Sequence, residues 1–430
     1  MTPQWFQENV FPGRRVSAVH VVPGSIHRGK HSAVAKLEVY FGDNASQATV
    51  FLKKSVRNDL PTRSAAHWKR DIASYRNEAT FYSHFASSVH ARGVSLIRPL
   101  AVFQSDPAGQ CSANLVTASD AVHAATCSDP ENFMMLLECL GSDSPVSSAS
   151  DEPRSLANYE AVDRLELVET RQALSYLANL HASAWGQEDL LENADSQLWS
   201  AACWWALPKR GEKELAQAAE IWPQVLRHWS KVFEAESTFP PTAELESLGE
   251  RMVEEAAYIS NCLSAEANAA LRTLVHGDFK SANLFFEAQS RKVVAFDWQW
   301  SGVGIGAMDV ANLLNTSVGI SQLASNEAEL ELLQFYYDCL SERLQALGVA
   351  SDLQKSYPFE AFERHYMLAS LEYARLLISN FWKRMTPESC AAKAENANCG
   401  LGYRSAPHVV RMVRKLHNGL KRVSAERVGS

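Results

Sequence analysis

The chain has 430 residues, 46% of them hydrophobic and 10% aromatic, so it can bury a sizeable core and could form two or three domains. Its formal net charge of −8 at pH 7 argues against a protein that binds nucleic acid through bulk positive charge. An anionic ligand held by a few local groups is still compatible with that charge.

The cysteine pattern and the first residues predict a reduced, cytoplasmic protein. The eight cysteines are scattered, with no C-x-x-C pair and no cysteine–histidine cluster at zinc spacing. The N-terminus lacks a basic start followed by an apolar run, so we expect no signal peptide. No stretch approaches the roughly 18 apolar residues of a membrane-spanning helix. We therefore expect free thiols and no stable membrane insertion, and the oligomeric state stays open.

Residues 1–140 show the pattern of a small sheet with one helix. Strands are predicted where apolar residues alternate or run between turn residues. They cover 16–22, 33–40, 48–53, 95–103 and 133–140. A helix is predicted over 71–85, where apolar residues recur at three- and four-residue steps. The stretch 105–131, rich in Ser, Ala and Asp, is expected to be a long surface excursion.

The segment 141–157 is the clearest low-complexity stretch, with many serines and acidic residues. It predicts a flexible connector between an N-terminal lobe, 1–140, and a C-terminal lobe, 158–430.

The C-terminal lobe is predicted to be mainly helical. Helical spacing of apolar residues extends over 165–185, 327–347, 359–385 and 406–423. His181, on the first of these helices, is expected to be a core histidine rather than a ligand. Five tryptophans lie between residues 195 and 235. They either fill the core or line a pocket, since pockets are mostly apolar with a few polar groups. The glycines of 301–309 predict a tight, irregular loop.

One stretch carries the chemistry of the chain, Leu274-Val-His-Gly-Asp-Phe-Lys-Ser-Ala-Asn-Leu284, followed by Val293-Val-Ala-Phe-Asp-Trp-Gln299. Phosphoryl transfer of the kinase type needs a carboxylate to accept the proton of the attacking hydroxyl. It also needs an Asn a few residues later and a second carboxylate after a strand, which hold Mg²⁺ on the phosphates. Asp278, Asn283 and Asp297 meet that pattern at both spacings.

The local sequence fits these roles. Leu274-Val275 predicts a short buried strand that leads into a loop, and Gly277 allows the backbone to turn there. The apolar runs 283–286 and 293–296 predict a hairpin. A hairpin would bring Asn283 and Asp297 to the same end of the sheet, where one metal could meet both.

His-Gly-Asp-x-x-x-x-Asn with Phe-Asp-Trp-Gln downstream resembles the aminoglycoside phosphotransferase and choline kinase-like superfamily, most closely its ecdysteroid kinase-like branch. The resemblance covers roughly residues 15–385 and is strongest over 274–313. It implies an α+β, protein-kinase-like bilobal fold, in which an N-terminal antiparallel sheet with one helix binds ATP and a mainly helical C-terminal lobe binds the acceptor. It implies a small-molecule kinase that uses ATP and Mg²⁺ and phosphorylates an alcohol.

The resemblance also implies roles in nucleotide binding. Lys53, at the end of the strand 48–53, matches the lysine that meets the α- and β-phosphates. Lys54 is the alternative, on the opposite face of a regular strand. Glu78 matches the helix glutamate that pairs with this lysine. The turn 23–32, with Ser25, would lie over the phosphates through its backbone N–H groups, but an ordinary hairpin is the alternative reading.

Backbone groups from Glu138 to Leu140 match the hinge that binds the adenine edge.

In the catalytic loop, the resemblance makes Asp278 the base and Asn283 and Asp297 the magnesium ligands. Lys280 matches a lysine that touches the γ-phosphate in protein kinases, although relatives vary there. His276 would keep the loop in shape. Asp309 would brace the loop from below, and it has an adequate local reason as an acidic residue at a helix N-terminus.

Two other functions compete with the small-molecule kinase. A protein kinase is disfavoured, because the loop reads His-Gly-Asp instead of His-Arg-Asp and no Ala-Pro-Glu follows. A pseudokinase that binds a nucleotide without turnover is the second alternative. All polar residues that the chemistry needs are present, which favours a working enzyme. A serine hydrolase is disfavoured because the chain has no G-x-S-x-G segment. The acceptor and the choice between ATP and GTP stay open.

Overall fold

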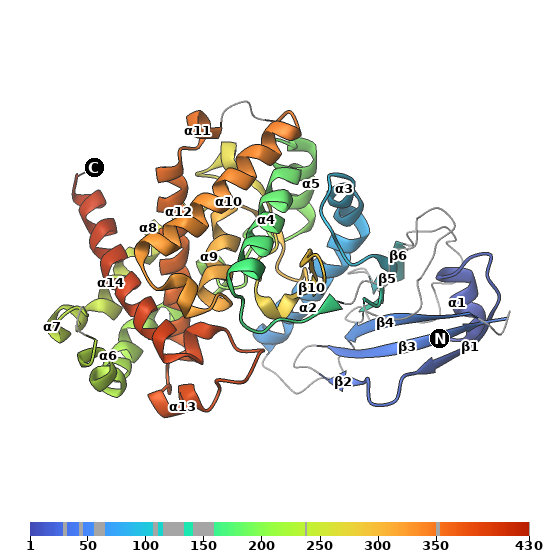
Figure 1. Cartoon of the computed structure of the whole chain (residues 1–430), viewed down its shortest axis with the longest axis horizontal. Helices are drawn as coiled ribbons and strands as arrows, with labels where there is room; N and C mark the ends of the chain where they lie inside the picture. The colour runs from blue at the N-terminus through green and yellow to red at the C-terminus, as the bar shows by residue number, and fades with distance from the viewer. Residues whose placement is uncertain are drawn as a thin grey trace. The chain divides into compact units, whose positions relative to one another are not determined.

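The computed structural model describes residues 1–28, 32–42, 46–55, 65–105, 111–114, 133–140, 159–236, 239–349 and 353–429 (Figure 1). The chain forms two compact units, Met1–Glu160 with Phe285–Gln299 and Ala161–Leu284 with Trp300–Ser430. The segment Phe285–Gln299 therefore groups with the N-terminal part of the chain. The predicted connector 141–157 falls outside the described residues, and the lobe boundaries stay a prediction.

The first unit is built on an antiparallel sheet with the strand order β1-β3-β4-β7-β5-β6, and β2 pairs with β3 at one edge. The strands are β1 (Val16–Val21), β2 (His27–Arg28), β3 (Ala33–Phe41), β4 (Gln47–Ser55), β5 (Pro99–Ser105), β6 (Cys111–Asn114) and β7 (Phe133–Glu138). Alternate residues of β3 and β4, such as Leu37, Val39 and Val50, face a core that also holds Trp5 and Phe6 of α1 (Pro3–Asn9). This alternation is why these segments fold as strands.

The predicted helix of the first unit is present. It comprises α2 (Ala65–Thr80), which continues through a π-helical turn (Phe81–Phe85) into α3 (Ala86–Ala91). Tyr75 and Tyr82, on the apolar face predicted from the sequence, are fully buried.

A second, three-stranded sheet in the order β11-β10-β8 lies within the first unit for most of its length. Its strands are β8 (Tyr159–Glu160), β10 (Leu284–Glu287) and β11 (Val293–Ala295). The pairing of β10 with β11 confirms the predicted hairpin.

Two local expectations were wrong. Part of the predicted surface excursion forms β6, which pairs with β5. Its sequence, Cys-Ser-Ala-Asn, has no β-branched or aromatic residue to signal a strand. The glycine-rich stretch after Trp300 contains β12 (Gly302–Gly304), which pairs with β9 (Thr273–Val275). A side chain at Gly302 would come within 2.1 Å of the Trp199 carbonyl oxygen, so glycine is needed there for close packing.

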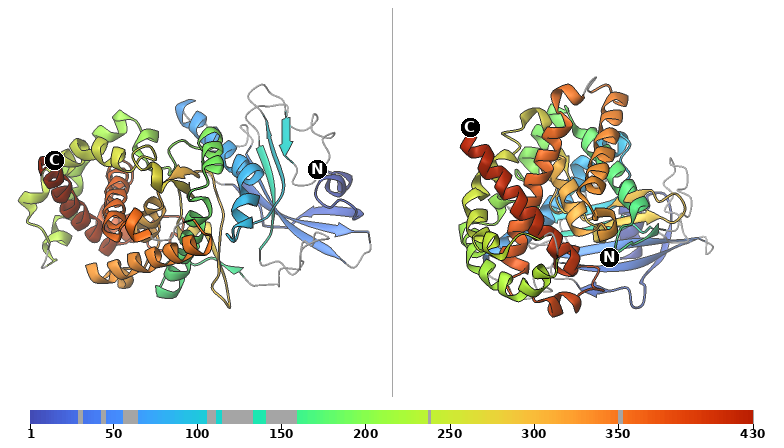
Figure 2. Two further views of the ribbon diagram at one scale, coloured as in Figure 1. Left: turned by 90° about the horizontal axis from the view of Figure 1, so that it is seen from above. Right: turned by 60° about the vertical axis from the view of Figure 1, so that its left-hand side comes forward.

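The second unit is mainly helical, as predicted. Its helices are α4 (Leu167–Ala184), α5 (Glu188–Gln197), α6 (Glu212–Glu234), α7 (Thr242–Leu245), α8 (Leu248–Cys262), α9 (Ala307–Thr316), α10 (Asn326–Ala346), α11 (Leu353–Ser356), α12 (Phe359–Leu376), α13 (Pro387–Ala391) and α14 (Ala406–Gly429). The central helix α9 is buried on all sides. Helix α12 packs against α9, α8 and α14, while α4 packs against α10 (Figures 1 and 2).

The contents of the two units confirm the predicted fold class, an antiparallel sheet with one long helix in the first and helices in the second. None of the helices in the described ranges is both long and apolar enough to cross a membrane.

The buried histidine His408 makes the stability of the second unit depend on pH. Its Nε2 lies 2.9 Å from the Val318 carbonyl oxygen and its Nδ1 lies 2.8 Å from the Ser405 hydroxyl. Burial lowers the pKa of His408 from 6.5 to about 4, and the Val318 carbonyl opposes that shift only in part. In the unfolded chain, His408 therefore becomes protonated near pH 6.5. In the folded chain, it becomes protonated only near pH 4.

We predict that His408 lowers the free energy of unfolding by up to about 3 kcal/mol as the pH falls from 6.5 towards 4. Urea unfolding from pH 7 downward should show a weaker pH dependence for His408→Gln than for the wild type. The exposed His228→Gln is the matched control and should leave the dependence unchanged. Equal slopes for wild type and His408→Gln would contradict the prediction.

Candidate active site

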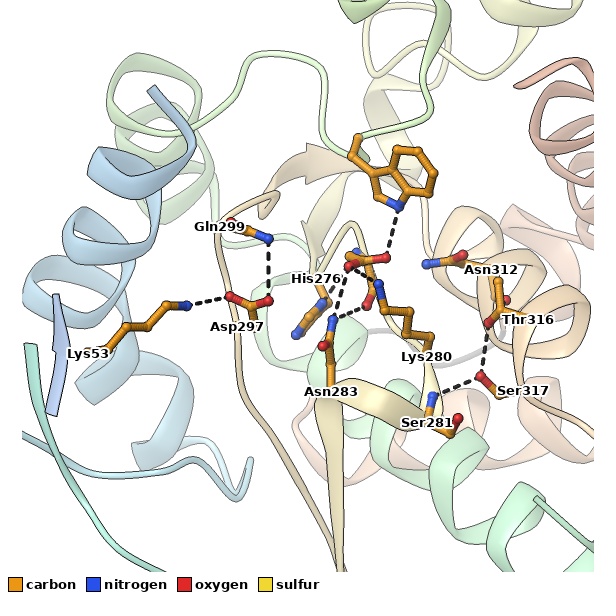
Figure 3. A network of polar contacts seen from close by, with 12 residues as sticks. Lys53, His276, Lys280, Ser281, Asn283, Asp297, Gln299, Asn312, Thr316 and Ser317 are labelled. Atoms are coloured by element: carbon orange, nitrogen blue, oxygen red, sulfur yellow. Dashed lines mark hydrogen bonds and ion pairs between the residues drawn. The ribbon is translucent and has the colours of Figure 1, made fainter. Parts of the chain in front are cut away.

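The loop after β9 gathers two polar side chains around one carboxylate. Asp278 is buried, with 4% of its surface exposed. Its Oδ2 accepts hydrogen bonds from Lys280 Nζ at 2.7 Å and from Asn283 Nδ2 at 3.1 Å (Figure 3). Asn283 Nδ2 also donates to the Asp278 carbonyl oxygen at 2.8 Å. Asp278 and Asn283, two of the three residues singled out by their spacing, are therefore in direct contact, and Lys280 contacts the same carboxylate.

A third side chain, that of Trp204, contacts the same carboxylate, and the sequence analysis did not predict it. Its indole Nε1 donates to Asp278 Oδ1 at 2.8 Å. Nothing in the spacing of the two residues predicted this contact, because they lie in separate segments. The sequence left open whether the five tryptophans between residues 195 and 235 fill the core or line a pocket. Three of them are core residues, whereas Trp199 and Trp204 are partly exposed. The core residues are Trp205, Trp222 and Trp229.

Asp309 braces the loop from beneath, as predicted. Its Oδ2 accepts the backbone N–H of His276 at 2.6 Å, and its Oδ1 accepts that of Gly277 at 2.9 Å. His181 Nε2 lies 3.3 Å from Oδ2, and its Nδ1 lies 2.7 Å from the Tyr336 hydroxyl. His181 is a fully buried core histidine, as expected. A charged group inside the unit thus satisfies two successive loop amides that would otherwise be orphaned.

Gly277 serves two purposes at this loop. Its φ of +80° lies in the left-handed region, which glycine adopts without steric cost. A side chain would also come within 2.1 Å of the Trp300 carbonyl oxygen and 2.8 Å of the Cys203 nitrogen. The sequence predicted the turn but not this close approach of a second chain segment.

The first unit holds a separate charged cluster around Lys53. Its Nζ contacts Glu78 Oε2 at 2.7 Å. The same Nζ contacts Asp297 Oδ1 at 2.6 Å (Figure 3). The predicted Lys53–Glu78 pair is therefore present, and which of Lys53 and Lys54 meets the phosphates stays a prediction. Burial lowers the pKa of Lys53, but the two carboxylates outweigh burial and raise it. Burial raises the pKa of Glu78 to about 7, against the effect of Lys53.

Asp297 is held in a strained backbone conformation. Its φ is +68°, in a region that costs a non-glycine residue about 1–3 kcal/mol. The next residue, Trp298, stacks on Phe81 with ring centroids 4.0 Å apart, and its carbonyl oxygen accepts from Asn77 at 3.2 Å. Gln299 Nε2 donates to Asp297 Oδ2 at 3.3 Å. Contacts with α2 and its extension thus fix the turn that aims this carboxylate, and the sequence signalled neither Asn77 nor Phe81.

The other predicted nucleotide contacts have structural partners of their own. Ser25 Oγ donates to the Val22 carbonyl oxygen at 2.7 Å and accepts from the Lys36 backbone at 3.1 Å. Glu138 exchanges two hydrogen bonds with the backbone of Arg98, through its own N–H and through Oε1. Leu140 follows the end of β7. Their contacts with a nucleotide stay predictions, and residues 29–31 of the turn are outside the described residues.

The donor set suits a magnesium ion that is bound mainly through phosphates. In the described part of the chain, no group of three or more His, Cys, Asp and Glu side chains is placed to hold a metal. Asn283 contacts Asp278 through its amide nitrogen only, so its amide oxygen is not used there. An amide oxygen and the Asp297 carboxylate are hard oxygen ligands, and Mg²⁺ usually takes one or two of these together with substrate phosphates.

A carboxylate loop in one unit and a Lys–Glu–Asp cluster in the other are the parts of a kinase-like protein. The comparison with protein families agrees. Residues 152–349 match the model of the ecdysteroid kinase-like family, which confirms the resemblance drawn from the sequence.

Solved structures with a similar arrangement have low identity and low structural overlap. A Plasmodium vivax ethanolamine kinase has a TM-score of 0.42 and 10% identity, covering 94% of this chain and 84% of that one. A choline kinase from Streptococcus pneumoniae has a TM-score of 0.35 and 12% identity, covering 94% of both chains. A type I macrolide 2′-phosphotransferase has a TM-score of 0.35 and 12% identity, covering 92% of both. No curated protein matches the chain.

We predict that Gly277→Ala is much more damaging than Gly211→Ala. Both glycines have a φ of +80°, but an added Cβ at Gly211 meets no atom within 4 Å. Gly211→Ala should therefore show only the left-handed penalty, about 1–2 kcal/mol. Gly277→Ala adds a clash with two backbone segments. Urea unfolding should show a clearly larger loss for Gly277→Ala, and equal losses would contradict the packing argument.

Proposed function

We propose that the protein is a small-molecule kinase, which transfers the γ-phosphoryl group of ATP to an alcohol hydroxyl. The observation that supports this best is the buried Asp278 carboxylate, which Lys280 and Asn283 hold on a loop braced by Asp309. A pre-organised carboxylate of this kind is what proton acceptance from an alcohol requires.

Asp278 orients the acceptor hydroxyl and takes its proton. The acceptor oxygen forms a new bond to the γ-phosphorus, the bond to the bridging oxygen breaks, and ADP leaves with the electron pair. Lys280, bonded to the same carboxylate, keeps Asp278 in place and lies on the loop that would face the transferring phosphoryl group. Positioning and fixed charge supply most of the acceleration in this reaction class.

The nucleotide is assigned to the residues of the first unit. Lys53, held by Glu78, contacts the α- and β-phosphates. The turn with Ser25 covers the phosphates, and the backbone from Glu138 to Leu140 takes the adenine edge.

The magnesium ligands in this proposal are Asn283 and Asp297. A bound Mg²⁺ would neutralise the negative charge that the phosphates carry.

A small acceptor is favoured over a protein substrate by the chain after Asp297. Gly302–Gly304 is committed to β12 and its pairing with β9, and α9 begins at Ala307. No length is left there for a peptide-binding activation segment.

The thiols of Cys390 and Cys399 are free, which supports a cytoplasmic site of action.

Asp278→Asn should lower turnover by about 100- to 10,000-fold, because the amide cannot accept the proton. Mg-ATP consumption by the purified protein would be measured over choline, ethanolamine, sterols, aminoglycosides and sugars. The exposed Asp338→Asn is the control and should keep wild-type turnover. Turnover that survives in Asp278→Asn would rule out this residue as the base. Mg-ATP binding with no turnover on any acceptor would favour the pseudokinase.

Lys53→Met should weaken Mg-ATP binding by at least about tenfold, because a charge-assisted contact with phosphate is lost. The neighbouring Lys54→Met is the matched control and should bind as the wild type does. Isothermal titration calorimetry of both variants measures the affinities, with thermal melts to verify folding. If Lys54→Met showed the larger loss, the two lysines would have to exchange roles.

A further inference from the structure

We propose that Trp204 is a positioning residue for Asp278, which orients the carboxylate so that Oδ1 faces the acceptor hydroxyl. This inference rests on the proposed kinase function and adds a residue that the catalytic motif does not contain. Trp204 lies outside the loop, in the segment that precedes α6.

The two oxygens of Asp278 have different partners. Oδ2 accepts from the Lys280 ammonium and the Asn283 amide, at 2.7 and 3.1 Å. Oδ1 accepts from the Trp204 indole alone among the hydrogen bonds that the described residues make to it, at 2.8 Å. A cation and a second donor withdraw electron density from Oδ2, whereas Oδ1 carries one neutral donor. Oδ1 is therefore the oxygen that retains a lone pair for the acceptor proton.

An indole suits this role because of its chemistry. Its N–H donates a hydrogen bond and has no lone pair to accept one, so it cannot compete with Asp278 for the proton. It carries no charge, so it does not oppose proton transfer to Oδ1 as a second ammonium group would.

The segment that carries Trp204 is fixed on both sides. The Cys203 N–H donates to the Trp300 carbonyl oxygen at 3.2 Å, and the Trp204 N–H donates to the Gly277 carbonyl oxygen at 3.3 Å. These contacts place the segment on the loop itself. Cys203 has a φ of +70°, a strained conformation of the kind that clusters at functional sites.

Two buried charges of α12 hold the residues that follow. Arg375 Nη2 donates to the Trp205 carbonyl oxygen at 2.7 Å, and Glu372 Oε1 accepts from the Leu207 N–H at 2.6 Å. Both side chains are almost completely buried. The indole is therefore pre-organised, which is what precise orientation of a catalytic group requires.

Trp204 is also partly exposed, unlike the core residue Trp205. Its ring meets Phe381 edge to face at 6.0 Å, and Phe381 stacks on Tyr403 at 4.6 Å. All three rings are partly exposed. Trp204 therefore does more than fill the core, and an acceptor bound at Asp278 Oδ1 would lie beside its indole N–H.

The kinetic test compares Trp204→Phe with Trp204→His. Phenylalanine keeps an aromatic ring but loses the donor, whereas imidazole matches the five-membered half of indole and keeps an N–H at the same place. With an acceptor that the wild type phosphorylates, we expect kcat to fall about tenfold or more in Trp204→Phe, while KM for ATP is unchanged. Trp204→His should recover much of the loss. A wild-type kcat in Trp204→Phe, or equal losses in both variants, would overturn the proposal.

A second measurement does not need turnover and separates this proposal from the kinase assignment. Indole ¹⁵N–¹H spectra of the full chain should show one signal lost in Trp204→Phe, which assigns Trp204. Asp278→Ala should move that signal and leave the buried Trp222 signal, whose indole binds the Leu245 carbonyl oxygen, in place. A Trp204 signal that does not respond to Asp278→Ala overturns the contact. A signal that responds, without turnover on any acceptor, supports the contact while the kinase assignment fails.

Discussion

The carboxylate of Asp309 is the constraint on which the second unit's site depends. It is fully buried at the start of α9 and accepts two successive loop amides, those of His276 and Gly277. Leaving such a carboxylate unpaired in the interior would cost several kcal/mol, so its two hydrogen bonds favour this one conformation of the loop. The direction of the next residue, Asp278, follows from that anchor. Lys280 and Asn283 then fix its side chain, but only because the backbone is already fixed.

Strained backbone occurs both at the Lys53 cluster and beside the Asp278 loop, and it too indicates that the backbone is fixed by its surroundings. Asp297 and Cys203 both have positive φ, and each precedes a tryptophan that is held by specific contacts. Trp298 stacks on Phe81, and Trp204 bonds to Asp278. Strain of this kind persists only when the surrounding structure over-determines it. In the first unit the strained residue is Asp297 itself, and in the second it is the neighbour of the tryptophan that contacts Asp278, which agrees with the roles proposed for these two carboxylates.

The sequence predicted what depends on short-range pattern and failed where distant segments meet. Alternation predicted the strands β1, β3, β4, β5 and β7, and helical spacing predicted α4, α10, α12 and α14, but not α6 or α8. The D-x-x-x-x-N spacing predicted the cluster of Asp278 and Asn283. The sequence of β6 has no strand pattern, and this segment forms a strand only through its pairing with the edge of β5. Trp204 could not be predicted either, because an isolated tryptophan gives no sign of the partner that its N–H will find.

The cost of the buried charges bears on whether the protein turns over substrate. Lys53, Glu78 and Asp297 form a cluster with more negative than positive charge, and burial, together with the nearby Asp297 carboxylate, raises the pKa of Glu78 to about 7 against the opposing effect of Lys53. Replacing buried charges of this kind with apolar residues of similar volume is often neutral or stabilising. A module that merely bound a nucleotide could dispense with Asp278 and its three donors, since they lie in a different unit from the lysine cluster. Retaining both costly sets agrees with the proposed phosphoryl transfer, in which the first set would hold the phosphates and the second would accept the proton.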